Sequence, residues 1–196
     1  ENRIHFQLAK TALSGGTDVC FCDSYYTSPV STTGYFSMNS SATNSGGWAS
    51  SQMRTNICGT SLSSYSGTII AVIPAALRAV LKSVTKYTDN TGNNSTSASA
   101  VTATKDYFFL LSEFEVFGSI SYGNTNEKNK QAQYAYYSAG NSKVKYKHNG
   151  TSAAARWWLR SPLASSSDGF ENVNTNGTVE DRTARASFGF APGFCV

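Results

Sequence analysis

The chain has 196 residues, of which 40% are hydrophobic and 14% charged, and its net charge is +4. This hydrophobic content is too high for a disordered chain, and the length suits one domain with a real core. No run approaches the ~20 apolar residues that span a bilayer, and no stripe of Lys and Arg is present to hold nucleic acid. We therefore predict a single domain over residues 1–196, with no membrane insertion and no nucleic-acid partner.

Sequence motifs for common chemistry are missing. His5 and His148 are the only histidines, and neither has a partner at metal-ligand spacing. The motifs HExxH, GxxxxGK[ST] and GxGxxG, which mark metalloprotease, phosphate and dinucleotide sites, do not occur. We therefore expect no catalytic residue, no metal site and no cofactor.

The cysteines leave the redox state open, because four of them allow three disulfide pairings. Buried free thiols acting as small hydrophobic side chains are the favoured interpretation. The chain begins at Glu1 with neither an initiator methionine nor a signal peptide, so we expect a fragment of a longer protein. The cysteines are Cys20, Cys22, Cys58 and Cys195.

The N-terminal half is predicted to contain short strands and two helices. Residues 48–57 have a helical composition. A helix over 74–85 is predicted more strongly, because Pro74 suits its first turn and the apolar residues that follow have helical spacing. These apolar residues are Leu77, Val80, Leu81 and Val84. Alternating apolar residues predict short strands over Arg3–Leu8, Val19–Phe21 and Tyr35–Met38.

The middle of the chain is predicted to alternate long polar loops with one buried element. The polar stretches 89–104 and 118–150 have the composition of loops. Between them, the apolar run 106–111 predicts a buried strand, and residues 112–116 predict a short turn of helix.

The C-terminal forty residues have two aromatic strands around a polar segment. Residues 156–162 predict a strand, in which one of Trp157 and Trp158 faces the core while the other borders a surface. Arg160 is expected to make a structural hydrogen bond or ion pair. Residues 188–196 predict the second strand, which leaves the intervening segment as a displayed loop anchored by a few apolar residues. The expected anchors are Phe170 and Val173.

Five short motifs occur in an order that resembles a known family. They are Gly-Gly-Trp at 46–48 leading to Met53-Arg54, Ile73-Pro74, Phe-Phe-Leu-Leu-Ser-Glu at 108–113, Trp-Leu-Arg-Ser-Pro at 158–162 and Gly-Phe-Ala-Pro-Gly-Phe-Cys at 189–195. The series resembles the C-type-lectin-fold domains of gut bacteria and their phages, and most closely the variable proteins of diversity-generating retroelements. The resemblance covers nearly the whole chain.

This resemblance implies an α+β C-type-lectin-like fold with two helices, short antiparallel strands and large polar inserts. It also implies a non-catalytic binding protein with a hypervariable segment near 163–188, diversified by a reverse transcriptase that miscopies template adenines. The ligand would be a protein or another cell-surface molecule. The location would be a bacterial cell surface or a phage virion, in the manner of an adhesin.

The resemblance also implies which residues contact the ligand, because Asn codons of the form AAY are the usual targets. Residues reachable from such codons are Leu163, Ser166, Asp168, Gly169, Thr178, Asp181, Arg182, Thr183, Arg185, Ala186 and Phe188. Glu171 and Glu180 complete the expected site but depart from the pattern, since glutamate needs a purine in the third codon position. Apolar, aromatic and Arg side chains are the expected carriers of affinity, namely Leu163, Arg182, Arg185 and Phe188.

Two alternatives remain open at the level of sequence. One is a glycan-binding lectin or adhesin domain, in which carboxylate and amide oxygens would hold calcium, although a Glu-Pro-Asn triplet is absent. These oxygens belong to Glu171, Asn172, Asn174, Asn176, Glu180 and Asp181. The other is a relative of the formylglycine-generating oxidases, for which Cys58 or Cys195 would be the candidate copper ligand.

Overall fold

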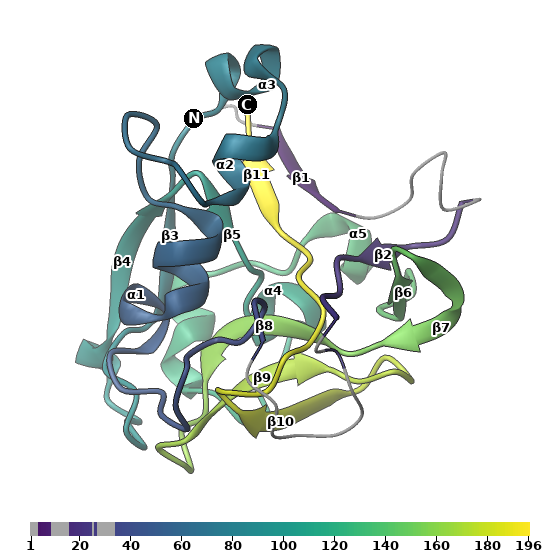
Figure 1. The fold of residues 1–196 in the computed structure, drawn as a ribbon. Helices are drawn as coiled ribbons and strands as arrows, with labels where there is room; N and C mark the ends of the chain where they lie inside the picture. Colours follow the sequence, from purple (N-terminus) through teal and green to yellow (C-terminus); the bar gives the residue numbers. More distant parts are fainter. Residues whose placement is uncertain (1–3, 9–15, 25, 27–33) are drawn as a thin grey trace.

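The computed structural model describes residues 4–8, 16–24, 26 and 34–196. Within these ranges, three sheets of three strands and one of two strands surround a shared hydrophobic core, with short helices between them (Figure 1). The mixed α+β class predicted from the sequence is therefore confirmed.

The strands form four sheets with the orders β1-β11-β5, β10-β9-β8, β2-β6-β7 and β3-β4. All pairs within these sheets are antiparallel except β2 with β6, which is parallel. The bounds are β1 (His5–Gln7), β2 (Val19–Cys20), β3 (Val84–Asp89), β4 (Val101–Asp106), β5 (Phe108–Phe109), β6 (Lys145–Lys147), β7 (Gly150–Ala155), β8 (Trp157–Pro162), β9 (Gly169–Val173), β10 (Val179–Thr183) and β11 (Gly193–Cys195).

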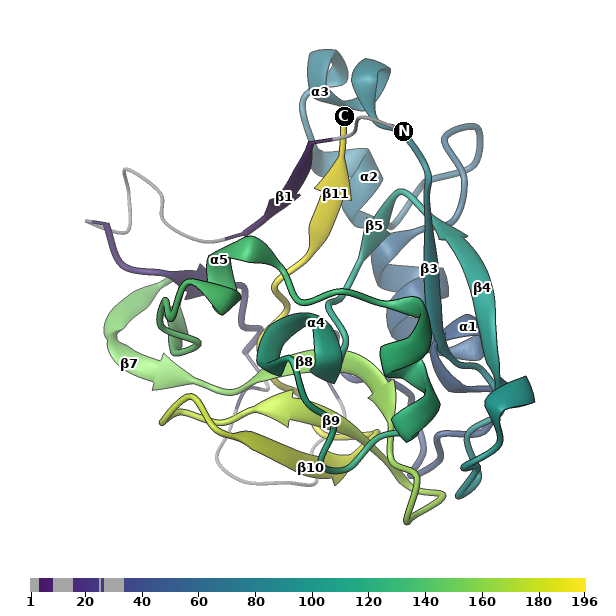
Figure 2. The same ribbon diagram turned by 180° about the vertical axis from the view of Figure 1, so that it is seen from behind.

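The helices are all short and lie around the sheets (Figure 2). They are α1 (Gly47–Ser50), the π-helix η2 (Met53–Cys58), α2 (Ile69–Val72), α3 (Ala75–Val80), the 3-10 helix η3 (Ala98–Ala100), α4 (Glu113–Phe117), the 3-10 helix η4 (Thr125–Lys130) and α5 (Ala135–Ser138).

The first and last described strands pair with each other, so the two ends of the chain lie at the same side of the molecule (Figure 1). Phe6 of β1 is opposite Phe194 of β11, and Phe194 is in turn opposite Phe108 of β5. Residues in one register row project to the same face of a sheet. The three phenylalanines therefore form a row on one face, and their neighbours His5 and Phe109 project to the other.

Helix α4 begins at a capping box. The Ser112 hydroxyl accepts a hydrogen bond from the Glu115 backbone N–H at 3.2 Å, and the Glu115 carboxylate accepts one from the Ser112 N–H at 3.1 Å. These two bonds satisfy backbone donors that the first turn would otherwise leave unpaired. The helix ends at Gly118, whose φ of 69° suits glycine. The predicted turn of helix after the buried run is therefore confirmed.

Both tryptophans of β8 belong to the core, which corrects the expectation that one of them borders a surface. The side chains of Trp157 and Trp158 are fully buried. The Trp158 indole N–H donates to the Phe36 carbonyl at 2.8 Å, and the Trp157 indole N–H donates to the Lys143 carbonyl at 3.0 Å. Each face of β8 is covered by another segment, so alternation along the strand does not bring either ring to the surface.

The helix predicted over 74–85 is shorter than expected. It ends at Val80, and Leu81 already has an extended backbone with φ −58° and ψ 134°. Val84 opens β3, where it pairs with Asp106 of β4. Pairing with a distant strand overrides the local helical spacing of the apolar residues. The predicted helix over 48–57 is likewise divided, because Ser51 is extended between α1 and η2.

Three segments predicted as loops contain regular structure. Residues 89–104 include the end of β3 and the start of β4, and residues 118–150 include η4, α5, β6 and the start of β7. Residues 163–188 include both β9 and β10. Conversely, Tyr35–Met38 is not a strand, because Ser37 makes only an isolated bridge with Ser187.

Candidate binding surface on the β8–β9–β10 sheet

The segment singled out by the sequence forms the outer part of a three-stranded sheet. β9 pairs with β8 on one side and with β10 on the other. Every residue of β8 and β9 is buried, whereas every residue of β10 is half-buried. The accessible part of the segment therefore consists of β10 and the loops at its two ends (Figure 2).

Eight of the residues predicted to contact a ligand remain accessible. Asp168, Thr178 and Arg185 are exposed. Thr178 lies in the turn between β9 and β10, and the other two lie just outside the hairpin. The others are half-buried, and most of them lie on β10. These half-buried residues are Ser166, Glu180, Asp181, Arg182 and Thr183.

Five of the predicted contact residues are buried, so they do not belong to the accessible surface. Phe188 has 1% of its side chain exposed, and its ring centroid lies 4.7 Å from that of Trp158. The expectation that Phe188 and Leu163 carry affinity is corrected by this packing, since both side chains fill the core. The buried set is Leu163, Gly169, Glu171, Ala186 and Phe188.

A cluster of charged and polar side chains is centred on Glu180 of β10. One carboxylate oxygen of Glu180 lies 3.0 Å from the Arg182 guanidinium and 3.3 Å from Arg156 Nε. The other accepts a hydrogen bond from the Asn174 amide at 2.8 Å. Half-exposed pairs of this kind contribute little stability, about 0–1 kcal/mol each. Their effect is to hold the side chains of the outer strand in defined positions.

Buried polar atoms without a hydrogen-bond partner are concentrated in this hairpin. Six such side-chain atoms occur in the described part of the chain, and five of them belong to β9 and β10. Each unsatisfied buried group costs about 1–3 kcal/mol. Such groups cluster where a structure serves something other than its own stability. The five atoms are both carboxylate oxygens of Glu171, Asn172 Oδ1, Arg182 Nε and Thr183 Oγ1.

Glu171 faces the core beside a second carboxyl group, that of Glu113. A Cβ atom placed on Gly123 would lie 2.5 Å from a Glu171 carboxylate oxygen and 3.6 Å from one of Glu113, so both groups converge on this glycine. The Glu113 carboxylate already accepts hydrogen bonds from three backbone N–H groups. Burial, and then the nearby charge of Glu113, raise the pKa of Glu171 well above its ordinary value. The protonated, uncharged form of Glu171 is therefore favoured at this position.

The oxygens proposed for calcium are divided between the core and the hairpin turn. Glu171 and Asn172 are buried within β9, while Asn174 and Asn176 lie in the turn that follows. Among the residues that the structure describes, no group of three or more His, Cys, Asp or Glu side chains is arranged to hold a metal ion.

All four cysteines are free and buried, as the sequence favoured. The Cys20 and Cys22 sulfur atoms are 4.0 Å apart, a contact rather than a bond. Burial raises the pKa of the Cys58 thiol well above its ordinary value. A thiol held protonated in this way is a poor nucleophile and a poor metal ligand.

The fold and this surface define a mixed α+β domain that presents a polar outer strand on a buried sheet. A family model described as a domain of unknown function, DUF6273, matches residues 27–196. The chain therefore belongs to the DUF6273 family. No curated protein and no solved structure matches the chain. Among the helices described, none has the length and apolar character needed to cross a membrane.

Proposed function

We propose that this domain is a non-catalytic binding protein with a C-type-lectin-like scaffold, and that its ligand surface is β10 with the loops at both ends of the hairpin. The observation that carries this proposal is the contrast between the buried strands β8 and β9 and the accessible strand β10 beside them. The frame is held by packing, while the accessible side chains do not contribute to the core.

This division has an energetic consequence for the accessible side chains. Substitutions on the surface usually change the free energy of unfolding by no more than ~0.5 kcal/mol. The outer strand can therefore carry many different residues on the same frame. Arg182 and Arg185 are the accessible residues of the type that dominates binding hot spots. We propose that they contact the ligand, a protein or other molecule on a cell surface.

The order of the five motifs supports a variable protein of a diversity-generating retroelement, displayed on a bacterial surface or a phage virion. Burial narrows the positions at which variation is tolerated. Leu163, Ala186 and Phe188 have codons reachable from AAY, but their side chains pack in the core. We therefore propose that variation is confined to the accessible residues, which are Ser166, Asp168, Thr178, Asp181, Arg182, Thr183 and Arg185.

Deep sequencing of this gene in its source population tests the proposal. We expect substitutions to concentrate at the accessible positions of 163–188 and to coincide with adenines in a nearby template copy. Helix α4 provides the internal control, because its capping box and buried glutamates should not vary. A segment as invariant as α4 would overturn the retroelement proposal, and a fixed binding surface would then be the better explanation.

A further inference from the structure

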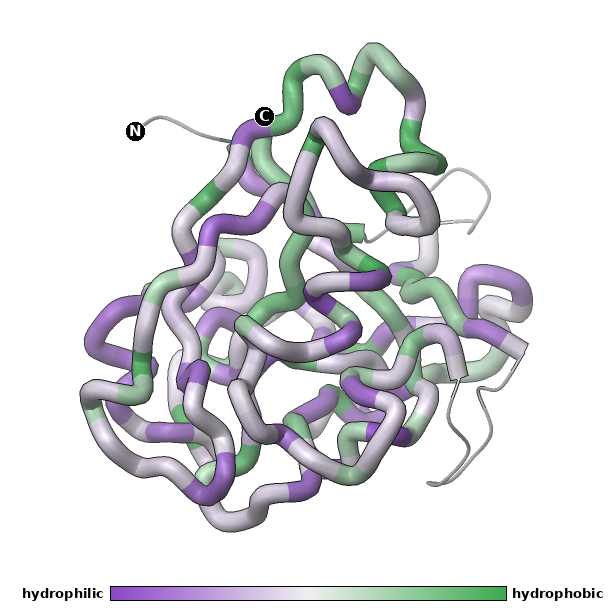
Figure 3. The backbone as a smooth tube through the Cα atoms, turned by 60° about the vertical axis from the view of Figure 1, so that its left-hand side comes forward, coloured by the Kyte–Doolittle hydropathy of each residue, from purple (hydrophilic) through white to green (hydrophobic). Residues whose placement is uncertain are grey.

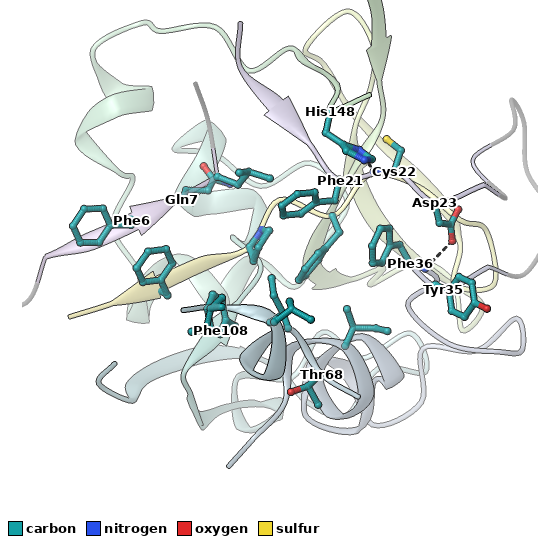
Figure 4. A pocket seen from close by; sticks show the side chains of 18 of the residues that line it. Phe6, Gln7, Phe21, Cys22, Asp23, Tyr35, Phe36, Thr68, Phe108 and His148 are labelled. Atoms are coloured by element: carbon teal, nitrogen blue, oxygen red, sulfur yellow. Dashed lines mark hydrogen bonds between the residues drawn. The ribbon is translucent and has the colours of Figure 1, made fainter. Parts of the chain in front are cut away.

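A second accessible concavity lies between the sheet β1-β11-β5 and helices α2 and α3. It is a groove of about 820 Å³ (Figure 4). Its floor includes the row of Phe6, Phe194 and Phe108, whose neighbouring ring centroids are 5.2 Å and 5.4 Å apart. The floor is therefore a continuous aromatic surface that spans three strands.

The wall opposite this floor consists of apolar side chains from α2, α3 and the turn between them. Val72 has 80% of its side chain exposed, and Leu77, from the predicted amphipathic helix, lines the groove instead of the core. Figure 3 shows this segment, beside the C-terminus at the top, as mainly hydrophobic. The apolar face that the sequence assigned to a core helix is thus divided. Leu77 lines the groove and Val80 is exposed, whereas Leu81 and Val84 pack in or against the core. The other lining residues of this wall are Ile69, Ile73 and Pro74.

The far end of the groove is where polar side chains join the lining. His148 is exposed there, and its Nδ1 accepts a hydrogen bond from the Cys22 backbone N–H at 3.1 Å (Figure 4). In the neutral ring the proton is then on Nε2, which has no hydrogen-bond partner among the described residues. Asp23, close by, accepts bonds from the Phe36 N–H and the Ser187 hydroxyl. This end of the groove therefore offers one available hydrogen-bond donor, the Nε2–H of His148, close to the Asp23 carboxylate.

The dimensions and chemistry of the groove select among occupants. Its volume lies within the ~300–1,000 Å³ typical of small-molecule sites. Among the described lining residues, Asp23 and His148 are the only ones of the Asp, Glu, Lys, Arg and His types, so little along the groove would pair with a charged ligand. A peptide laid along it would bury N–H and C=O groups against apolar walls, at about 1–3 kcal/mol for each unsatisfied group. A hydrocarbon chain has no such groups.

We propose that this groove binds the hydrocarbon chain of a free single-chain amphiphile, with an uncharged oxygen-bearing head group accepting a hydrogen bond from His148. The aromatic row and the α2–α3 wall enclose the chain, and burial of its surface supplies the affinity. The described lining contains no Lys or Arg that would pair with a carboxylate, so the site prefers an alcohol to the corresponding acid. This proposal does not depend on the function proposed for β10.

Fluorescence titration with the neutral apolar dye N-phenyl-1-naphthylamine provides the test. We expect saturable binding of the dye and its displacement by dodecan-1-ol at lower concentrations than by dodecanoate, both below micelle formation. Absence of saturable dye binding would overturn the proposal. Better displacement by a short apolar peptide than by the alcohol would overturn it in favour of a protein partner.

Two variants and a matched control place the dye in the groove. Phe6→Ser and Val72→Asp alter exposed lining side chains, so each is expected to retain the fold and to weaken dye binding by about tenfold or more. Val80→Asp changes another exposed valine, on α3 but outside the lining, and should leave binding within about twofold. Equal weakening of dye binding in Val80→Asp would show that the dye does not bind in the groove.

His148→Phe tests the head-group contact separately. This variant should retain dye binding and require a higher concentration of dodecan-1-ol than the wild type to displace the dye. Near-ultraviolet circular dichroism of all variants verifies that the aromatic core is unchanged. Displacement by dodecan-1-ol at an unchanged concentration in His148→Phe would exclude His148 as the hydrogen-bond donor.

Discussion

Arg160 and Glu115 form an ion pair at the centre of the protein, with the Arg160 NH1 atom 2.5 Å from a Glu115 carboxylate oxygen. The other oxygen of Glu115 accepts from Lys86 Nζ at 2.8 Å. Arg160 also donates to the Thr88 hydroxyl and to the Leu110 carbonyl. Strand β8 is thereby tied to β3, to the segment after β5 and to α4. Burial alone would raise the pKa of Glu115, but the two cations lower it to about 2.

Glu115→Gln is expected to lower the free energy of unfolding by about 3–5 kcal/mol, because it leaves two buried cations without their anion. Urea denaturation measures the loss. Glu180→Gln is the matched control, since Glu180 is half-exposed and its ion pairs are worth about 0–1 kcal/mol. Similar small effects in both variants would show that the buried cluster is not required for stability.

The same carboxylate makes stability depend on acidic pH. The pKa of Glu115 is lower in the folded protein than its ordinary value near 4.5, so its stabilising contribution is present above pH 4.5 and is lost as the pH falls through about 2. Urea denaturation across this range should show a smaller loss in Glu115→Gln than in the wild type. Identical losses of unfolding free energy in the two proteins would show that Glu115 does not cause the acid dependence.

Glu171 is expected to make the free energy of unfolding fall as the pH rises, the opposite of the effect of Glu115. Burial and the nearby Glu113 charge raise its pKa in the folded protein, so its contribution is present below the unfolded pKa and is lost as the pH rises through the folded value. Burial also raises the pKa of Glu127 to about 7, so this residue adds to the decline in the free energy of unfolding as the pH rises. Between about pH 5 and pH 8, Glu171→Gln should therefore lose less unfolding free energy than the wild type.

The control for this experiment is Asp168→Asn, which neutralises an exposed carboxylate in the same segment. Its pH dependence should follow that of the wild type. A Glu171→Gln variant with the wild-type slope would mean that Glu171 is already ionised in the folded protein.

Because the Ser112 hydroxyl is part of the capping box of α4, its removal is predicted to lower the stability of the protein. Ser112→Ala should lower the free energy of unfolding by about 1–2 kcal/mol, because a backbone N–H of the first turn loses its acceptor. Thermal unfolding monitored by circular dichroism provides the measurement. Ser119→Ala, at an exposed position just after the helix, should change stability by no more than ~0.5 kcal/mol. An equally small change in Ser112→Ala would show that the cap is dispensable.

The C-terminal segment contains both buried core residues and accessible surface residues. Substitutions at one residue of each kind should differ in their effect on the free energy of unfolding. Phe188→Ala should cost about 3–5 kcal/mol, because it leaves a cavity against Trp158. Arg185→Ala, three residues earlier and exposed, should cost no more than ~0.5 kcal/mol. Chemical denaturation of both variants distinguishes them. A small cost at Phe188 would return this residue to the candidate ligand surface.

Features that depend on local composition could be predicted from the amino-acid sequence. The apolar run at 108–111 is buried, Phe170 and Val173 anchor the C-terminal segment, and Arg160 makes structural contacts. The prediction that the cysteines are free and buried is also confirmed. In each case the side chain's own hydrophobicity or charge decides whether it is buried and what partner it needs, and neighbouring residues are enough to recognise it.

Features that depend on partners distant in the sequence could not be predicted in this way and emerge from the packing of the folded chain. Val84 has helical spacing but joins β3, because its partner Asp106 on β4 is available. Leu77 of α3 lines an open groove, and Glu171 turns inward beside Glu113, although both patterns were compatible with other placements. Strand pairing and burial on a given face are set by contacts between remote segments, which no local pattern of residues records.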